Sequence, residues 1–299
     1  MPGMPNGSMS PPSSPDASRK NADPSRLSFE DLAHKRDGDI DVLLGALLVA
    51  RDVYPDLDVP ALVRALDELA APLFPLRLEE HTAEEQARLL GEYLYGRLGF
   101  AGNETDYYDP KNSLLSDVLT LRVGIPLTLA IVYCEVARRV GVPARGVGFP
   151  GHFLVRIERR GAAPLMIDPF FRGKVLTEDD LRARLSRVLG EREAEDLEPH
   201  LGVANPRAIL VRLLTNLKAI YLTRGDRARA HLALDRIVSL LPHSPAPLHE
   251  RGRLAALLGA RESARDDLTR ALTLHPDDAE AGRIKAELAQ LGGKRSTLN

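Results

Sequence analysis

The fold is decided by residues 124–157, which read GIPLTLAIVYCEVARRVGVPARGVGFPGHFLVRI. The first half is apolar almost all round, which is typical of a helix central to a core. It begins with Gly124-Ile125-Pro126, and proline suits the first helical turn because its missing N–H would have no partner there. Gly141 predicts the end of this helix. Beyond it the apolar period changes from 3.6 residues towards 2, which predicts strands over residues 146–149 and 152–157.

The segments on either side complete a mixed α+β pattern. Residues 165–170 predict a strand that returns after a turn at residues 159–162, and residues 177–189 predict a helix with Thr177 and Asp180 as a capping pair. Before the central helix, amphipathic runs predict helices over residues 41–50, 60–70 and 82–98. Thr82 and Glu85 have the spacing of a capping box, and Asn112 or Ser113 is expected to cap a short helix ending at Arg122.

The last third of the chain contains a repeat. Gly225 and Gly259 lie 34 residues apart, and the same spacing separates Leu241-Pro242 from His275-Pro276. A 34-residue period of helix, glycine, helix and proline is typical of tetratricopeptide (TPR) repeats. Two units are fewer than stand-alone stacking usually needs, so this tail is expected to pack on the first domain. His243, His249 and His275 are expected at exposed turns or helix starts.

Four segments follow from these patterns. Residues 1–27 are rich in Pro, Ser, Gly and Asn and are predicted to be a disordered arm, because so few apolar side chains cannot offset the ordering entropy. Residues 28–203 are predicted to form an α+β domain and residues 204–292 TPR-like helices. Residues 293–299 are predicted to be a flexible C-terminus.

Composition excludes several classes of function. Aromatic residues are 5 % with no Trp, and the net charge is −2, so neither an aromatic nucleic-acid platform nor a global basic field is present. The single Cys134 excludes an intramolecular disulfide and a zinc site built on several thiolates. No phosphate-binding loop, GxSxG motif or metal-ligand spacing occurs, so no cofactor and no metal are expected. Neither a membrane span nor a secretory signal is apparent, and a cytoplasmic protein is expected.

Charge is divided unevenly along the chain. Residues 207–299 carry 16 Lys and Arg against 10 Asp and Glu, whereas the preceding residues carry an excess of acidic groups. The basic tail could bind an acidic partner, or its arginines could form a solvated face.

Three residues of the middle segment have the side chains of a catalytic triad. Cys134 offers a thiol, His152 a base, and Asp168 a carboxylate that could fix the imidazole tautomer. Pro150 and Gly151 allow the backbone to bend before His152. The preceding loop could line the same cleft with Tyr107, Tyr108, Asp109 and Asn112, or these residues could serve in turns and caps.

Together these motifs resemble the SirB-type, transglutaminase-like bacterial proteins, whose members also carry C-terminal TPR units. The motifs are Asn112-Ser113, Gly124-Ile125-Pro126, the segment 140–145, the segment 148–153 and Ile167-Asp168-Pro169-Phe170. The resemblance implies a papain-like core, with the nucleophilic Cys at the start of the central helix and His and Asp on adjacent antiparallel strands. The group's name implies a role in regulating gene expression, without a defined biochemical activity.

His152 and Asp168 match the superfamily pattern, but the nucleophile does not. In catalytic members a Gly-x-Cys precedes the Gly-Val/Ile-Pro-Ala-Arg segment by about four helical turns, and that count places Pro126 at the Cys position. Cys134 lies roughly 12 Å further along the helix, away from the positive end of its dipole and on an apolar stripe. Thr128 could supply a substitute hydroxyl only if the helix began later.

The sequence therefore favours a non-catalytic protein that binds a peptide or protein partner through its TPR tail and a vestigial cleft. The candidate cleft residues are Tyr107, Tyr108, Asp109, Asn112, Pro126, His152 and Asp168. A regulatory role follows from the resemblance alone. Two alternatives stay open. One is a cysteine hydrolase or acyl transferase that uses Cys134, His152 and Asp168, and the other is a scaffold in which only the TPR tail matters.

Overall fold

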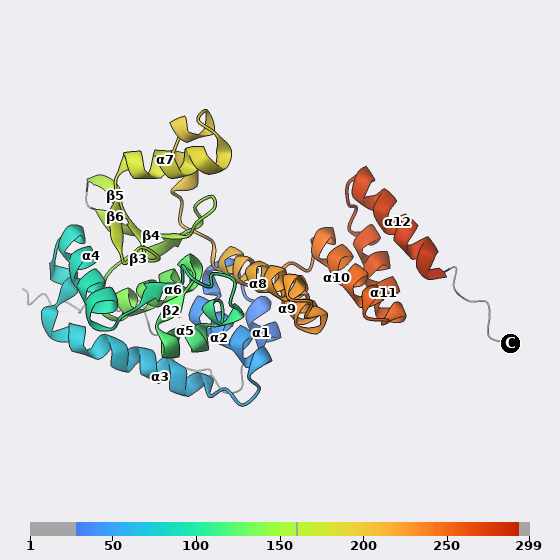
Figure 1. Ribbon diagram of the computed structural model, residues 1–299, viewed down its shortest axis with the longest axis horizontal. Helices are drawn as coiled ribbons and strands as arrows, with labels where there is room; N and C mark the ends of the chain where they lie inside the picture. Colours follow the sequence, from blue (N-terminus) through green and yellow to red (C-terminus); the bar gives the residue numbers. More distant parts are fainter. Residues whose placement is uncertain (1–27, 160, 293–299) are drawn as a thin grey trace, which may run out of the picture.

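The computed structural model describes residues 28–159 and 161–292. The predicted disordered arm, residues 1–27, and the predicted flexible C-terminus, residues 293–299, lie outside the described residues. The described chain is an α+β domain followed by paired helices, so the predicted fold class is confirmed (Figure 1).

Helices make up the first part of the chain. They are α1 (Phe29–Ala33), α2 (Val42–Val53), α3 (Val59–Ala70), α4 (Ala83–Gly91), α5 (Leu115–Leu121) and α6 (Pro126–Arg139). Short 3₁₀ turns lie between them at η2 (Asp37–Asp39), η3 (Ala71–Leu76), η4 (Leu78–Glu80) and η6 (Pro110–Asn112). Figure 1 shows α6 in the middle of this part, with the sheet on one side and α3 on the other.

The predicted helix starts and ends are confirmed at some positions and wrong at others. Pro126 is the first residue of α6, and the Thr82–Glu85 capping box is present at α4. The expected single helix over residues 82–98 instead changes at Glu92 into a π-helix, η5 (Glu92–Arg97). Neither Asn112 nor Ser113 caps α5, because Leu114 precedes it and no side chain bonds to its first turn.

Two sheets form from the remaining segments. The short strands β1 (Ala101–Gly102) and β2 (Val123–Gly124) pair in parallel just before α6. The larger sheet is antiparallel in the order β3 (Ala144–Val147), β4 (Leu154–Arg159), β5 (Ala162–Asp168) and β6 (Lys174–Leu176). The predicted strands are present but shifted by a few residues along the chain. His152 therefore lies in the turn before β4 rather than within a strand, which corrects the sequence prediction.

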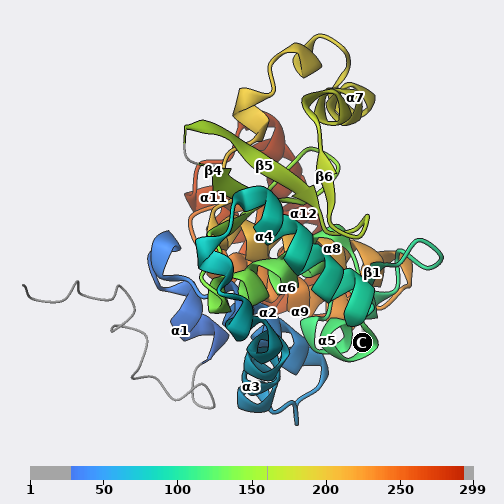
Figure 2. The same ribbon diagram turned by 90° about the vertical axis from the view of Figure 1, so that its left-hand side faces the viewer.

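The larger sheet is buried on both faces. Val155 and Ile167 belong to the main core with α6, whereas their neighbours Leu154 and Met166 belong to a second cluster with α7 (Glu178–Leu189). This alternation follows from the period of 2 in a strand. Figure 2 shows α4 crossing the sheet beside β4 and β5, and Figure 1 shows α7 on the far side. The capping pair Thr177 and Asp180 at the start of α7 is confirmed.

The C-terminal helices belong to two different cores. After the turns η7 (Glu193–Glu195) and η8 (Glu198–His200) come α8 (Pro206–Thr223) and α9 (Arg227–Leu240), whose apolar residues are part of the main core. Helices α8 and α2 cross at close range. A Cβ on Gly45 of α2 would lie only 2.5 Å from Cδ1 of Leu210 on α8. Arg236 adds a bidentate pair with Asp52, at 2.8 Å for both bonds.

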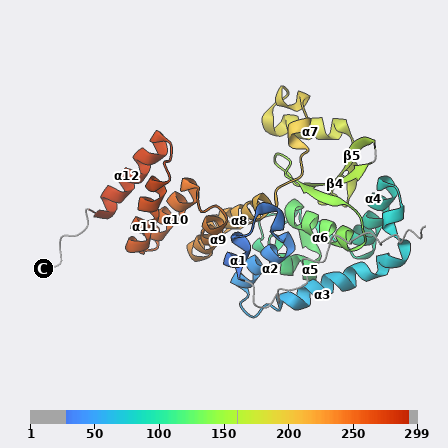
Figure 3. The same cartoon turned by 180° about the vertical axis from the view of Figure 1, so that it is seen from behind.

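The last three helices are α10 (Pro245–Leu257), α11 (Arg261–Thr273) and α12 (Asp278–Gly292). They share a separate small core and extend away from the rest of the molecule (Figures 1 and 3). The expected exposure of His249 is wrong. Its side chain is 8 % exposed, and the ring contacts the carboxylates of Glu280 and Glu287, at 3.4 and 3.0 Å.

Candidate functional site

A tight turn places His152 at the edge of the sheet. The amide of His152 donates to the carbonyl of Phe149 at 3.0 Å, with Pro150 and Gly151 between them and φ of +67° at Gly151. This is the arrangement of a type II turn, in which the third residue needs a positive φ that glycine adopts without strain. The Pro-Gly pair therefore bends the chain at this point and brings the imidazole to the end of β5.

Asp168 is the last residue of β5 and is fully buried. Its Oδ1 accepts from His152 Nε2 at 2.9 Å and from the amides of Phe170 and Phe171 at 3.0 and 3.2 Å. Its Oδ2 lies 2.7 Å from Nη1 of Arg184, an ion-pair contact in which the N–H is not aligned for a hydrogen bond. A buried carboxylate with these partners fixes both the tautomer and the orientation of the imidazole.

The partners of Asp168 decide its protonation. Burial alone would raise the pKa of the Asp168 carboxyl, but the bond from His152, the charges of His152 and Arg184, and the Phe171 amide outweigh burial. The pKa of Asp168 therefore lies below its ordinary value, and the group is a carboxylate at neutral pH.

Two arginines that sequence analysis did not single out complete this region. Arg184 comes from α7, and its guanidinium also lies over the ring of Phe171, 5.4 Å from the centroid. Arg212 comes from α8 and donates to the carbonyls of His152 and Phe149, at 2.7 and 3.4 Å. Arg212 therefore holds the turn that carries His152, whereas Arg184 holds Asp168 and Phe171.

Aromatic rings form a continuous row beside the dyad. The ring of His152 stacks on Phe171 and meets Phe170 edge-on, with centroid distances of 6.2 and 6.1 Å. Phe170 contacts Tyr107 at 6.0 Å, and Tyr107 contacts Tyr108 at 5.2 Å. The row therefore runs from the dyad to the loop that precedes α5.

The start of α6 offers no nucleophile. Pro126 is buried at the first helical position and carries neither a thiol nor a hydroxyl. The nearby hydroxyl of Thr128 is fully buried, donates to the carbonyl of Asn112 at 2.7 Å and accepts from the amide of Ile125 at 3.2 Å. This hydroxyl is committed to holding the loop against α6.

Cys134 lies in a different place from the dyad. It packs against the main core and faces a pocket of about 320 Å³ beside Arg145 and Ile209. Neither His152 nor Asp168 lines that pocket. Burial raises the pKa of the Cys134 thiol to about 12, with Glu135 adding to the shift. The structure therefore does not bring the three candidate triad residues together.

The loop residues have separate roles. The Asn112 amide donates to the carbonyls of Asp106 and Tyr107, at 2.7 and 3.2 Å, and Asp109 caps the turn η6. These two residues shape the loop, whereas Tyr107 and Tyr108 project from it.

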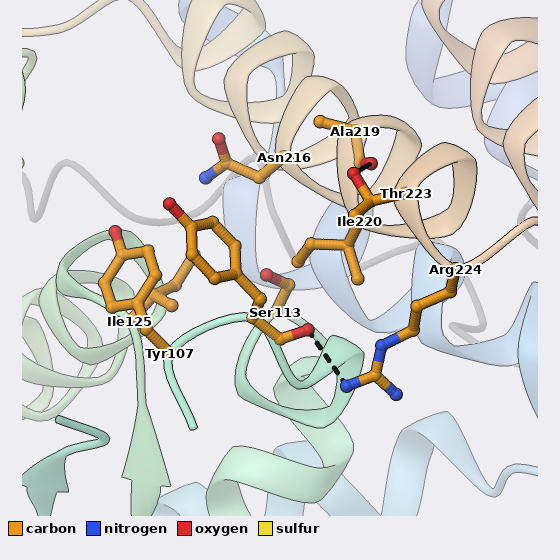
Figure 4. A pocket seen from close by; sticks show the side chains of 9 residues that line it. Tyr107, Ser113, Ile125, Asn216, Ala219, Ile220, Thr223 and Arg224 are labelled. Carbon is orange, nitrogen blue, oxygen red and sulfur yellow. Dashed lines mark hydrogen bonds between the residues drawn. The ribbon is translucent and has the colours of Figure 1, made fainter. Parts of the chain in front are cut away.

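A groove lies between this loop and α8. We call it the α8 groove; it has a volume of about 330 Å³ and is lined by Tyr107, Tyr108, Ser113, Ile125, Asn216, Ala219, Ile220, Thr223 and Arg224 (Figure 4). Figure 4 shows Tyr107 on one side of the groove and the α8 side chains on the other. Arg224 spans its end by donating to the carbonyl of Tyr108 at 3.2 Å. Because one wall comes from α8, reasoning on the separate segments could not locate this groove.

Comparison with protein families agrees with this architecture. Residues 60–215 match the model of the transglutaminase-like superfamily, and residues 217–289 match that of the tetratricopeptide repeat. The chain belongs to the transglutaminase-like superfamily and carries TPR repeats, as the sequence motifs predicted.

Relatives place the chain more narrowly. It is 38 % identical over 280 residues to a UPF0162 protein of Xylella fastidiosa, covering 89 % of this chain and 95 % of the relative. A UPF0162 protein of Pseudomonas aeruginosa is 33 % identical over 246 residues, covering 82 % and 89 %. The chain therefore belongs to the bacterial UPF0162, SirB-like family. Mouse F-box only protein 21 is 33 % identical over 176 residues, covering 56 % of this chain and 27 % of that protein.

No helix among the described residues is long and apolar enough to cross a membrane. TPR repeats stack helices into surfaces that bind other proteins, so the domain content supports a protein-binding role.

Proposed function

We propose that this protein is a non-catalytic binding protein that holds a peptide or protein partner along the aromatic row and the TPR helices. The observation that carries the proposal is Pro126 at the position where the transglutaminase fold places its nucleophile, with the Thr128 hydroxyl buried and bonded. An imidazole held by a carboxylate cannot perform acyl transfer without a thiol or hydroxyl to activate. A regulatory, intracellular role is part of this proposal and rests on the SirB-like family.

The surface beside the dyad has the features of a binding site. Tyr108 is 70 % exposed and Phe171 45 %, and both belong to the same aromatic row. Exposed aromatic side chains supply contact area at a low cost in conformational entropy. The dyad, Arg184 and Arg212 then act as the rigid support that holds these rings in place.

The thiol of Cys134 tests the enzyme alternative directly. Because its pKa is raised to about 12, the fraction of thiolate at pH 7 is small, and we expect iodoacetamide to label the native protein slowly. The rate should keep rising up to pH 9, the end of the accessible range, and denaturant should accelerate it at every pH. Mass spectrometry of the single cysteine gives the rate without ambiguity. Fast native labelling with a plateau below pH 8 would favour the enzyme.

Site-specific cross-linking tests the binding role. We expect p-benzoylphenylalanine in place of Tyr108, or of the 66 % exposed Leu257 at the end of α10, to cross-link a partner in cells. The control is the same replacement of Phe74, which is 53 % exposed in η3. Cross-links at Leu257 alone would favour the TPR scaffold. Cross-links at neither position, or equal ones at Phe74, would refute the proposed function.

A further inference from the structure

We propose that the α8 groove binds an extended acidic peptide segment, with one apolar side chain inserted beside Ser113 and a carboxylate on Arg224. This inference rests on the proposed function and deepens it by naming the chemistry of the partner. Three features of the groove point to this ligand: an unsatisfied hydroxyl, the composition of the α8 wall, and the charge at the ends of that wall.

The hydroxyl of Ser113 indicates a missing ligand. Ser113 is fully buried and lines the groove, and among the described residues its Oγ has no hydrogen-bond partner. Buried polar groups are almost always bonded, so one left without a partner requires an explanation. Figure 4 shows Ser113 between the tyrosine side and Ile220. A peptide N–H or C=O that follows an inserted side chain would supply the missing bond.

The wall formed by α8 is apolar in its centre and polar at intervals. Asn216, Ala219, Ile220 and Thr223 have the i, i+3, i+4, i+7 spacing of one helix face. Ala219 and Ile220, with Ile125 opposite, suit an aliphatic side chain. The amide of Asn216 can bond a peptide backbone beside it.

Two cations stand at the two ends of this face. Arg212 and Arg224 both belong to the α8 segment, and both donate to backbone carbonyls. Within residues 28–159 and 161–292, neither guanidinium pairs with a carboxylate, whereas Arg207 and Arg236 of the neighbouring surface do. The charge of Arg212 also acts on Tyr107, where it partly offsets the burial that raises the pKa of the phenol. A half-buried face with two uncompensated positive charges selects an acidic partner.

The aromatic row favours an extended ligand. It continues from Tyr108 in the groove through Tyr107 and Phe170 to the dyad, on the same side of α8 as Arg212. An extended chain presents alternate side chains to one surface, so apolar and acidic residues in alternation match a groove with an apolar floor and cationic ends.

Three labelled octapeptides test the inference on the full chain. One alternates Glu and Leu, one alternates Lys and Leu, and one alternates Glu and Ser. Fluorescence anisotropy should show the Glu/Leu peptide binding at least about tenfold more tightly than either of the others. Equal binding of the Lys/Leu peptide would overturn the acidic preference, and equal binding of the Glu/Ser peptide would overturn the apolar anchor.

Matched variants locate the binding. Ala219→Trp fills the groove from an exposed position, so it should weaken binding of the Glu/Leu peptide at least about tenfold. The control is Ala208→Trp, also at an exposed position but about 16 Å away along α8, which should change the affinity less than about twofold. Ser113→Ala should weaken binding about threefold or more without lowering the stability, because the hydroxyl has no protein partner to lose.

Charge reversals separate a local contact from the overall field. Arg224→Glu should weaken binding of the Glu/Leu peptide about tenfold and strengthen binding of the Lys/Leu peptide. Arg265→Glu makes the same change in net charge on an exposed residue of α11, far from the groove, and should alter the affinity for both peptides less than about threefold because salt screens distant charges.

The outcomes distinguish this inference from the proposed function. Cross-links at Tyr108 that persist in Ala219→Trp, with no effect of that variant on peptide affinity, would overturn the α8 groove and leave the binding role standing. Absence of binding by all three octapeptides would overturn the inference as well. Sedimentation could instead show a dimer that Ala219→Trp dissociates. That result would assign the groove to a second copy of the chain and would also overturn the inference of a peptide ligand.

Discussion

Asp168→Ala is expected to lower the free energy of unfolding by about 3–5 kcal/mol, the typical cost of removing one partner from a buried charged pair. The substitution leaves Arg184 without its carboxylate and the amides of Phe170 and Phe171 without their acceptor. It also releases the ring of His152 from its only side-chain bond among the described residues. Equilibrium unfolding in urea measures the loss.

Two further variants separate the effect of the Asp168 charge on stability from the effect of its side-chain shape. Asp168→Asn keeps an oxygen for the two amides but removes the charge that faces Arg184, so its loss should be smaller than that of Asp168→Ala. Asp179→Ala removes a carboxylate whose side chain is 98 % exposed and should change stability by less than about 0.5 kcal/mol. A loss at Asp168→Ala no larger than that at Asp179→Ala would show that the dyad contributes nothing to the fold.

The pH dependence of the wild type follows from the same group. The folded-state pKa of Asp168 is lowered, so the unfolded chain binds more protons than the folded one at acidic pH. The stability that Asp168 contributes is therefore present above the ordinary carboxyl pKa near 3.9 and is lost as pH falls below it. In Asp168→Asn this part of the acid sensitivity should disappear.

Sequence patterns located the dyad because its signals are local. The Pro-Gly pair before His152 and the strand that ends at Asp168 are both visible within a few residues, and the antiparallel pairing of β4 with β5 then brings the two together. The strand limits were misplaced because the period of 2 continues into the turn, where Phe149 and Phe153 are buried like strand residues.

The rest of the site depends on contacts between distant segments. Arg184 and Arg212 reach the dyad from α7 and α8, and nothing in the residues around them marks such a contact. The change from α-helix to π-helix at Glu92 was not predicted either: Gly91 and Gly96 weaken the helical pattern there, but they do not specify a π-helix. Periodicity predicts which face of α8 is apolar, but not that its polar edge lies against the tyrosine loop.

The boundary between the first domain and the TPR tail also depends on contacts between distant segments. The repeat predicted helices from residue 204 onward that pack on the first domain, and the apolar side chains of α8 and α9 do share the main core with α2 and α6. The repeat did not show which of its helices make that contact. The superfamily match likewise extends into α8, to residue 215. Helix pairs with similar patterns can thus have different partners: among the described residues, α10–α12 form a small core with Val238 of α9, and Leu254 of α10 belongs to the main core.

Two truncations test this division, and they should differ sharply. Deletion of residues 206–299 removes from the main core the buried residues Ile209, Leu210, Leu213, Leu214, Leu217 and Tyr221. At about 1.5–3 kcal/mol for each buried large side chain, the loss equals or exceeds the whole stability of a typical domain, about 5–15 kcal/mol. We expect this fragment to lose its cooperative thermal transition and to bind the dye ANS.

Deletion of residues 244–299 removes only α10–α12 and keeps α8 and α9 in place, together with Arg236 and its pair with Asp52. The surface newly exposed on α9 centres on Val238, and Leu254 is the buried residue that the main core loses, so the loss should be a few kcal/mol and the transition should stay cooperative. Circular dichroism of both fragments beside the full chain measures the difference. Cooperative unfolding of the shorter fragment near the midpoint of the full chain would mean that α8 is an appended helix rather than part of the core, and the α8 groove would then lack a fixed wall.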